Sequence, residues 1–133
     1  MASNTFEFKI VSPDGKNYSD SCEILNLTLK DGAIGILKGH TPIIGIIEIC
    51  IMDYVKQGKR ICLTINGGVL NVKKDEVLIL ADSFETKDQI DKDRVLKAKA
   101  RAEERIKSND ANIDLKRAEV ALKKAINRLT LIN

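Results

Sequence analysis

Few side chains in this sequence have the types and spacing that catalysis requires. His40 is the only histidine, and nothing in the sequence supports a Ser-His-Asp set around it. Neither of the glycine patterns that cradle phosphates, G-x-x-x-x-G-K and G-x-G-x-x-G, occurs. The adjacent carboxylates Glu103 and Glu104 lie among basic residues of a solvated segment, where acid-base catalysis is not favoured. The chemistry therefore predicts a binding or regulatory protein rather than an enzyme.

The three cysteines are not expected to form a metal site. Cys22, Cys50 and Cys62 are far apart in the sequence and lie within apolar runs, whereas zinc requires close pairs of thiolates or imidazoles. Buried, reduced thiols of a cytosolic protein are the better interpretation. No apolar run reaches about 18 residues, so no membrane span is expected. The N-terminus lacks a basic segment followed by an apolar one, so no secretory signal is expected either.

The net charge of +3 is unevenly distributed. Residues 1–86 carry 9 Lys or Arg and 11 Asp or Glu, a net charge of −2, while residues 87–133 carry 13 and 8, a net charge of +5. The basic final third is expected to meet an acidic surface or an anion, although surface solvation alone could also account for it. Nucleic-acid binding is not favoured, because acidic rather than aromatic residues alternate with the basic ones.

Up to about residue 85, the apolar residues recur with the period of two that is typical of β-strands. Alternation is clear at residues 6–10, 25–29 and 61–65. Turn signals separate the runs at residues 12–15, 56–59 and 66–68. With 44% hydrophobic and only 4% aromatic residues, this region predicts a β-sandwich or barrel with an aliphatic core.

Two stretches of this region carry expectations of their own. Residues 43–55 are apolar nearly throughout, so we expect them to be buried on both faces or folded back on themselves. Residues 31–42, D-G-A-I-G-I-L-K-G-H-T-P, contain three glycines and a proline. Glycine and proline favour turns, so we expect a turn-rich connection between strands there.

After Glu85 the apolar period becomes that of helices. No glycine or proline follows Asp88, and good helix formers dominate. Acidic residues at the start suit the helix dipole and can cap free amides. A polar break at residues 108–112 separates two apolar seams: Val95, Ala98, Ala102 and Ile106, then Leu115, Ala118, Leu122, Ala125 and Leu129. The predicted fold is α+β with two domains, an antiparallel β-sandwich at residues 1–86 and an antiparallel two-helix hairpin at residues 87–133.

The helical seams are rich in alanine and therefore bury little apolar area. A hairpin held so weakly could detach from its body and open, and about 40 helical residues end to end would span about 60 Å. A hairpin permanently docked on the sandwich is the alternative.

Six segments along nearly all 133 residues form a recognisable series. They are F-K-I-V-S-P-D-G-K at residues 8–16, G-A-I-G-I-L-K-G-H-T-P at 32–42, G-G-V-L-N-V at 67–72, V-L-I-L-A-D at 77–82, I-D-K-D-R-V at 90–95 and A-I-N-R-L at 125–129. In this order they resemble segments of the epsilon subunit of bacterial and chloroplast F-type ATP synthases. The clearest match is residues 32–42, which are similar to that family's G-x-x-G-I-L-P-G-H-x-P.

The resemblance implies a non-catalytic rotor subunit that couples ion translocation to ATP synthesis, as a peripheral protein on the cytoplasmic face of the cell membrane. The sandwich would bind the gamma subunit and the ring of c subunits. The hairpin would switch between a folded form on the sandwich and an extended form. The extended form would meet the beta and alpha subunits of the catalytic hexamer and block ATP hydrolysis. No cofactor is required in this interpretation.

In some members of that family the folded hairpin binds regulatory ATP. The matching positions here are Glu85, Ile90, Asp91, Arg94, Arg101, Lys124 and Arg128. Guanidinium forks suit phosphate, and Asp91 could order Arg94. This chain departs from the pattern at Val95, where the motif has alanine, and at Lys124, where binders often have arginine. Helix-surface charges and caps are the alternative explanation of these residues.

The resemblance also suggests rotor contacts at Asp31, Ala33 and His40. Ala33 stands where relatives often have an acidic residue implicated in contact with the ring, so that contact would fall to Asp31 or to the backbone. His40 would close its loop by hydrogen bonds or contact gamma. Cys50 stands where relatives usually have a turn glycine, which leaves the geometry of that turn open.

Two other functions stay open on the sequence alone. One is a cytosolic ATP sensor whose hairpin closes on the nucleotide, and the other is an adaptor with a basic coiled coil for acidic partners. Co-purification with gamma would separate a rotor subunit from both.

Overall fold

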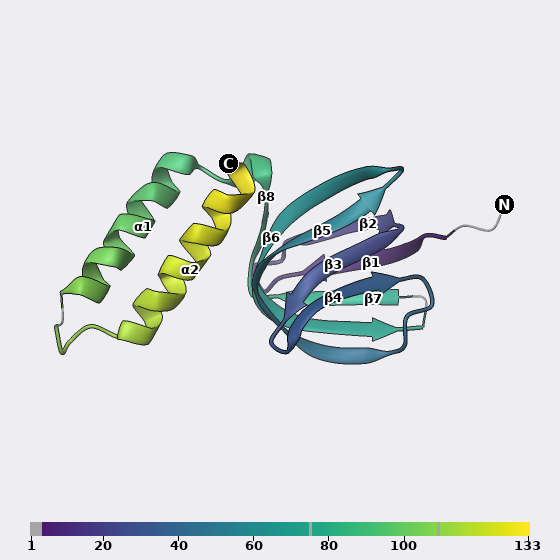
Figure 1. Ribbon diagram of the computed structural model, residues 1–133, viewed down its shortest axis with the longest axis horizontal. Coiled ribbons are helices and arrows are strands. Elements are labelled where there is room, and N and C mark those ends of the chain that lie inside the picture. Colours follow the sequence, from purple (N-terminus) through teal and green to yellow (C-terminus); the bar gives the residue numbers. More distant parts are fainter. Residues whose placement is uncertain (1–3, 75, 109) are drawn as a thin grey trace. The chain divides into compact units, whose positions relative to one another are not determined.

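The computed structural model describes residues 4–74, 76–108 and 110–133, and shows strands followed by helices (Figure 1). The elements are β1 (Phe6–Val11), β2 (Asn17–Cys22), β3 (Ile24–Leu29), β4 (Gly32–Leu37), β5 (Ile43–Lys56), β6 (Lys59–Lys73), β7 (Glu76–Ala81), β8 (Phe84–Thr86), the 3-10 helix η1 (Lys87–Gln89), α1 (Lys92–Lys107) and α2 (Leu115–Ile132). The chain divides into two compact units between Glu85 and Thr86. The predicted β-sandwich followed by two helices is confirmed.

The sandwich is organised around the long β5–β6 hairpin. The strands hydrogen-bond in the order β2-β1-β7-β6-β5-β3-β4, with β8 beside β6. β5 and β6 have 14 and 15 residues, and both curve strongly (Figure 1). β7 pairs with the second half of β6 and β3 chiefly with the second half of β5, so the hairpin contributes to both layers. Gln57 and Gly58, with φ of 51° and 76°, join them within the turn predicted at residues 56–59.

Alternating side chains fill the space between the layers. Leu25, Leu63, Ile65, Leu70 and Ile79 are all fully buried, as the period of two predicts. The few aromatic residues also lie inside: Phe8, Tyr54 and Phe84 are buried, and their rings contact each other or Tyr18. The core is therefore aliphatic with one aromatic cluster in it.

The expectation for residues 43–55 is wrong. They lie in the single strand β5, which is neither folded back nor buried on both faces, because Ile44 and Ile46 are 76% and 60% exposed. Cys50 is buried in the middle of this strand, so no turn exists at that position. An apolar residue on the outer face of a strand cannot be told from a buried one in the sequence. The apolar run at residues 43–55 was therefore interpreted as buried on both faces.

The predicted turn at residues 66–68 is also absent, since these residues lie within β6. Gly67 and Gly68 have φ of 88° and 145°. A Cβ on Gly68 would lie 2.2 Å from the carbonyl oxygen of Leu80. Glycine is required here because β6 approaches β7 closely, which is the usual reason for glycine inside a strand.

Strand direction and the 31–42 stretch differ in part from expectation. β1 and β7 pair in parallel, whereas the other pairs of described register are antiparallel. Alternation carries no information on direction, and no hairpin joins these two strands. Half of the expected turn-rich connection is the edge strand β4, with turns only before and after it.

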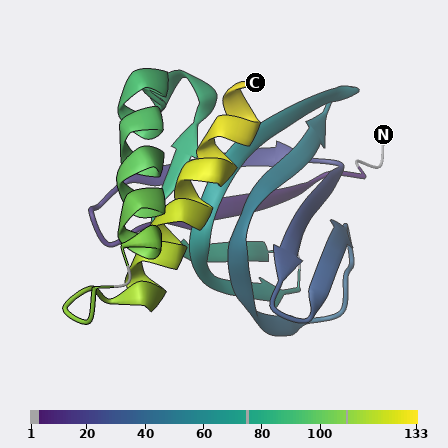
Figure 2. The same ribbon diagram turned by 60° about the vertical axis from the view of Figure 1, so that its left-hand side comes forward.

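The helical unit is a hairpin in which α1 and α2 lie side by side and run in opposite directions (Figures 1 and 2). The carboxylates of Asp91 and Asp114 cap the helices by accepting hydrogen bonds from the amides of Arg94 and Arg117, at 3.2 and 3.1 Å. Part of the predicted break, Asn109, lies outside the described residues.

The predicted helical seams are found with one exception. Val95, Ala125 and Leu129 form a buried cluster between the helices, with Ile90 and Ile132 packed against it. Ala102 and Ala118 are buried as well. Leu115, expected in the seam, is 51% exposed because it begins α2 beside the loop that joins the two helices.

Candidate functional site

A row of uncovered apolar side chains crosses four strands of the sandwich. Val11 lies opposite Leu80, Leu80 opposite Val69, and Val69 opposite Ile46. Residues directly opposite in neighbouring strands have their side chains on the same face. Ile46, Leu80 and Val69 are 60%, 48% and 39% exposed. We call these four residues the apolar row.

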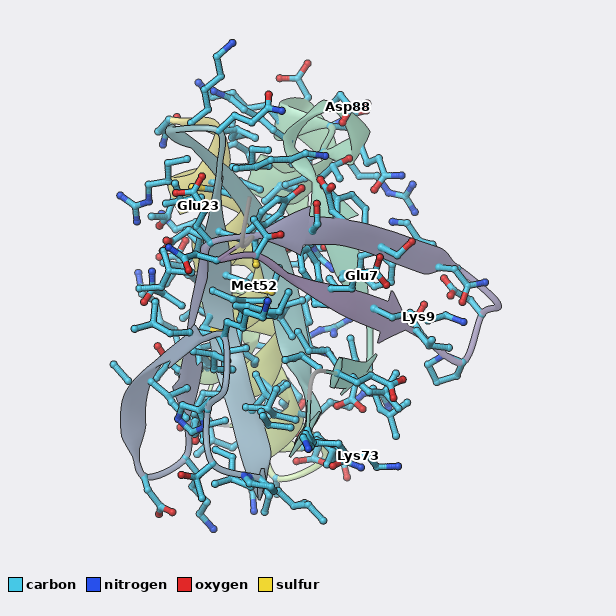
Figure 3. The ribbon with its side chains drawn as sticks, turned by 90° about the vertical axis from the view of Figure 1, so that its right-hand side faces the viewer. Glu7, Lys9, Glu23, Met52, Lys73 and Asp88 are labelled. Carbon is cyan, nitrogen blue, oxygen red and sulfur yellow. The ribbon has the colours of Figure 1, made fainter. Side chains whose placement is uncertain are left out.

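Polarity increases from the apolar row along the same face. The next line of opposed residues is Lys9, Leu78, Asn71 and Ile44, and the one after it is Glu7, Glu76 and Lys73. Glu7, Lys9 and Lys73 lie on the outside of the strands (Figure 3). An apolar patch with a polar border marks an interaction surface more often than an isolated exposed leucine does. The sequence signal for this surface was the run of isoleucines in residues 43–47, where side chains that point to opposite faces of the strand are both apolar.

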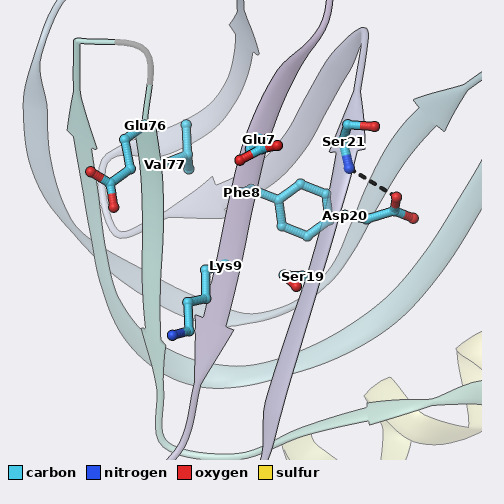
Figure 4. Close-up of a pocket in the computed structure, with 8 residues that line it drawn as sticks. All are labelled: Glu7, Phe8, Lys9, Ser19, Asp20, Ser21, Glu76 and Val77. Atoms are coloured by element: carbon cyan, nitrogen blue, oxygen red, sulfur yellow. Dashed lines mark hydrogen bonds between the residues drawn. The ribbon is translucent and has the colours of Figure 1, made fainter.

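The polar end of this face contains a shallow depression of about 450 Å³ between β1, β2 and β7 (Figure 4). Glu7, Lys9 and Glu76 border it, and the amide of Ser21 donates to the carboxylate of Asp20 at 2.8 Å. Charges of both signs stand on three strands there. This is the arrangement of a solvated strand surface, and we assign no ligand to it.

The three residues expected at rotor contacts do not form one patch. Asp31 lies in the turn before β4, and Ala33 is exposed near the start of that edge strand. His40 follows the other end of β4, and a six-residue strand is about 20 Å long. The His40 amide donates to the Leu37 carbonyl at 3.1 Å, and its Nδ1 lies 2.6 Å from the Thr41 carbonyl oxygen.

Part of the expected nucleotide set gathers at one end of the hairpin. Ile90 packs on the Val95–Leu129 cluster, Asp91 caps α1, and Arg94 is exposed in the first turn. Arg128 is half-buried and precedes Leu129, so the antiparallel helices bring it to the same end. The guanidinium groups at this end have the chemistry to bind an anion. The carboxylate of Asp91 already accepts the bond that caps α1 through one of its oxygens.

The remaining members of the set lie elsewhere. Arg101 is exposed seven residues beyond Arg94, about 10 Å along α1. Lys124 is half-buried one turn before Arg128 on α2. Glu85 belongs to the sandwich unit, where it is half-buried in the middle of β8 and bonded to β6. Basic side chains of both helices thus border the seam, and the chemistry of this donor set fits a phosphate group.

One side-chain network in the sandwich was not foreseen from the sequence. The Tyr54 hydroxyl donates to the Asp20 carboxylate at 2.9 Å and also hydrogen-bonds the hydroxyl of Tyr18, while the Lys56 ammonium pairs with Asp20 at 2.5 Å. Burial would raise the pKa of Asp20, but the bonds from Lys56, Ser21 and Tyr54 outweigh it and hold that pKa below its usual value. Burial raises the pKa of Tyr54, so its hydroxyl stays protonated.

The cysteines are free thiols of the sandwich. Burial raises the pKa of Cys22 to about 12 and also raises the pKa of Cys50. Both thiols are therefore protonated and unreactive at neutral pH. Cys62 is half-buried. Within the described ranges no group of three or more metal-ligating side chains occurs, and no helix there is both long and apolar enough to cross a membrane.

Family models match both units of the chain. The model described as ATP synthase, Delta/Epsilon chain, beta-sandwich domain matches residues 5–87, and the corresponding long alpha-helix domain matches residues 88–133. The chain is 42% identical over 125 residues to the ATP synthase epsilon chain of Bacillus licheniformis, covering 94% of this chain and 95% of that one. It is 40% identical over 125 residues to the epsilon chain of Desulfitobacterium hafniense, covering 94% of each.

Solved structures share the fold at lower identity. A chain of the mitochondrial ATP synthase of Euglena gracilis, solved as OSCP, F1 and c-ring, matches with a TM-score of 0.80 and 19% identity over 95% of this chain and 80% of that one. A chain of the central stalk and c-ring of the Tetrahymena thermophila mitochondrial ATP synthase matches with a TM-score of 0.59 and 12% identity, over 96% of each. With both units matched and relatives aligned over nearly the whole length, this chain belongs to the epsilon chains of the ATP synthase delta/epsilon family.

Proposed function

We propose that this chain is a non-catalytic central-stalk subunit that couples ion translocation to ATP synthesis and inhibits ATP hydrolysis through its hairpin. The observation that carries the proposal is the unequal cohesion of the two units. In the described part of the chain, the sandwich core has 19 buried residues, whereas the hairpin cluster has three. A weakly cohesive hairpin that is joined to a rigid sandwich can change conformation at low cost.

The apolar row is the surface we assign to the gamma subunit. Its support is the exposure of Ile46, Val69 and Leu80 in one continuous line with a polar border. Val69→Lys should abolish co-purification with gamma, because it places a charge in the centre of an apolar contact. Ser19 is exposed and lies opposite Lys9, on the polar border of the same face. Ser19→Lys is therefore the matched control and should leave co-purification intact. Retention of gamma by Val69→Lys would refute this assignment.

We assign the contact with the c-ring to the β3–β4 turn. Asp31 lies in that turn and Ala33 follows it near the start of β4, and Asp31 offers the exposed carboxylate that Ala33 cannot supply. His40 lies beyond the far end of β4, so it is not part of this contact. In this arrangement the protein is peripheral, on the cytoplasmic face of the membrane.

The partners we assign to the extended hairpin are acidic segments of the beta and alpha subunits. The hairpin region carries the +5 excess of the chain, and much of that charge stands on exposed positions of α1 and α2. Attraction between such a surface and an acidic partner weakens with salt. Inhibition of hydrolysis should therefore weaken as ionic strength rises.

ATP is the regulatory ligand we propose for the folded hairpin. Arg94 and Arg128 supply guanidinium groups at one end of the seam, and Arg101 and Lys124 extend the basic border. ATP would join the helices by binding cations from both, which favours the folded form. Calorimetric titration with Mg·ATP should give saturable heat, and no heat at millimolar ATP would refute this part.

The decisive experiment is truncation after Asp88 in the reconstituted enzyme, with the full-length chain reconstituted in parallel as the control. The truncated chain keeps the whole sandwich and loses both helices. We expect ATP hydrolysis to rise while gamma stays bound and ATP synthesis is retained. If hydrolysis does not rise, the inhibitory role is wrong for this chain.

A further inference from the structure

Two polar side chains of β6 are as deeply buried as the core. Thr64 and Asn66 are 0% and 1% exposed, and they alternate with Leu63 and Ile65, which are fully buried. Buried polar groups of this kind are nearly always hydrogen-bonded, and their partners indicate what they hold in place. Here the partners lie in one short segment, residues 83–85.

Asn66 holds this segment through both hydrogens of its side-chain amide. Nδ2 donates to Ser83 Oγ at 2.9 Å and to Glu85 Oε1 at 2.9 Å, and the backbone amide of Asn66 donates to the Ser83 carbonyl at 2.9 Å. With both hydrogens used, the orientation of the amide is fixed, because a flipped amide would turn its oxygen toward the carboxylate.

Thr64 holds the next residue. The backbone amide of Glu85 donates to Thr64 Oγ1 at 3.1 Å. The hydroxyl proton of Thr64 can go to either the carbonyl oxygen or Oε1 of Glu85, both at 3.3 Å. Glu85 is thus bonded to β6 through its backbone and its carboxylate.

This arrangement leaves one buried atom without a partner. Asn66 Oδ1 is buried and accepts no hydrogen bond. An apolar side chain would avoid that penalty, since an unsatisfied buried acceptor is destabilising. The presence of asparagine is explained if holding Ser83 and Glu85 matters more than the local stability of the core.

The bonding pattern changes immediately after Glu85. The bonds of Thr64 and Asn66 to this segment span 17 to 21 residues of sequence. Thr86, the last residue of β8, makes local bonds with its amide and its side chain: the amide donates to Gln89 Oε1 at 3.0 Å, and the hydroxyl donates to Asp88 Oδ1 at 2.6 Å. The division between the two units falls at the same place.

We propose that Thr64 and Asn66 are positioning residues that anchor Glu85 to the sandwich, so that any movement of the hairpin pivots after this residue. The anchor fixes the last sandwich residue in direction as well as position, because it holds both the backbone and the carboxylate. The segment from Thr86 to Asp91 is then the flexible connection.

The test is amide hydrogen exchange by NMR on the full-length, nucleotide-free protein. In the parent, the Glu85 amide should exchange at least about tenfold more slowly than that of Lys87. Thr64→Val removes the acceptor of the Glu85 amide, and exchange there should rise about three- to tenfold. Thr64→Ser should show parental exchange. Asn66→Asp places a second carboxylate beside Glu85 and should raise exchange at Glu85 more than tenfold.

Asn71→Asp is the matched control, with the same substitution on the same strand but on its outer face. It should leave the Glu85 amide unchanged. If Thr64→Val leaves Glu85 protected, or if Asn71→Asp has the effect of Asn66→Asp, the anchor does not exist. Exchange is measured without ATP, so failure of the parent to bind nucleotide would refute the ATP site while the exchange rates still decide whether the anchor exists.

Discussion

Hydrogen bonds within the sandwich join residues that are far apart in the sequence, whereas those within the hairpin join residues that are close together. In the sandwich, Tyr54 reaches Asp20 across 34 residues of sequence and Asn66 reaches Glu85 across 19. In the hairpin, the caps of Asp91 and Asp114 each reach only three residues. The hairpin is therefore built from two locally specified helices, and the sandwich from contacts that exist only once the whole unit has folded.

The same difference applies to apolar burial. The sandwich buries large side chains such as Phe8, Leu63 and Met52, whereas alanine supplies much of the buried surface between the helices. Because alanine buries little area, the two helices gain little from their contact. One unit is suited to bear load without deforming, and the other to change its conformation. Substitutions in each unit can test this contrast.

The largest effect is expected where two strands of the sandwich approach most closely. Gly68→Val would place Cβ 2.2 Å from the Leu80 carbonyl oxygen, at a backbone φ of 145°. We expect the free energy of unfolding to fall by more than about 3 kcal/mol, measured by urea denaturation. Gly58→Ala is the control, since φ is 76° there but nothing lies within 4 Å, and it should cost about 1 kcal/mol. Equal losses would contradict a rigid, closely packed sandwich.

A core truncation in the hairpin should remain confined to it. Leu129→Ala removes the largest buried side chain of the Val95–Ala125–Leu129 cluster. We expect the hairpin to lose about 2 kcal/mol of local stability, seen as faster amide exchange throughout α1 and α2. Exchange in β5 and β6 should not change. If β5 and β6 also lose protection, the two units fold as one and the contrast fails.

The sequence predicted the hairpin in more detail than the sandwich. The two helices, the acidic cap of α1 and most of the seam were predictable because their determinants lie within a few residues, as with Asp91 and Arg94. The cap of α2 was not identified, because it is Asp114 and lies beyond the predicted break. The two-residue turn at Gln57 and Gly58 was predictable for the same reason. The helical seam failed only at Leu115, where the end of the hairpin leaves a seam position uncovered.

The sandwich was predictable as an architecture and not in its details. The pairing of β1 with β7 is parallel and joins distant segments, so no local pattern encodes it. Gly68 was interpreted as part of a turn, because the residue that requires glycine there, Leu80, lies on another strand. The apolar row and the Glu85 anchor were missed in the same way, since each is assembled from several strands.

The Asp20 network offers a smaller, pH-dependent test of long-range contacts in the sandwich. The pKa of Asp20 is lowered in the folded state, so its contribution to stability is complete above the unfolded pKa of about 3.9 and is lost as the pH falls through the folded value. Asp20→Asn should therefore lower the unfolding free energy by about 1 kcal/mol at pH 7. The difference from the parent should vanish at strongly acidic pH. Asp31→Asn, in an exposed turn, should show no such difference, and a matching pH profile for both variants would contradict the assignment.

The smallest expected effect concerns the alkylation of the cysteines, which shows whether the sandwich core stays closed when the hairpin is removed. Burial holds Cys22 and Cys50 protonated in the core, and Cys62 is half-buried. In native protein at pH 8, iodoacetamide should alkylate Cys62 alone, with all three thiols reacting in denaturant. Truncation after Asp88 should leave this pattern unchanged, because both buried thiols belong to the sandwich core. Alkylation of Cys22 in the truncated chain, followed by mass spectrometry, would show that the sandwich depends on the hairpin and is not the independent rigid unit described here.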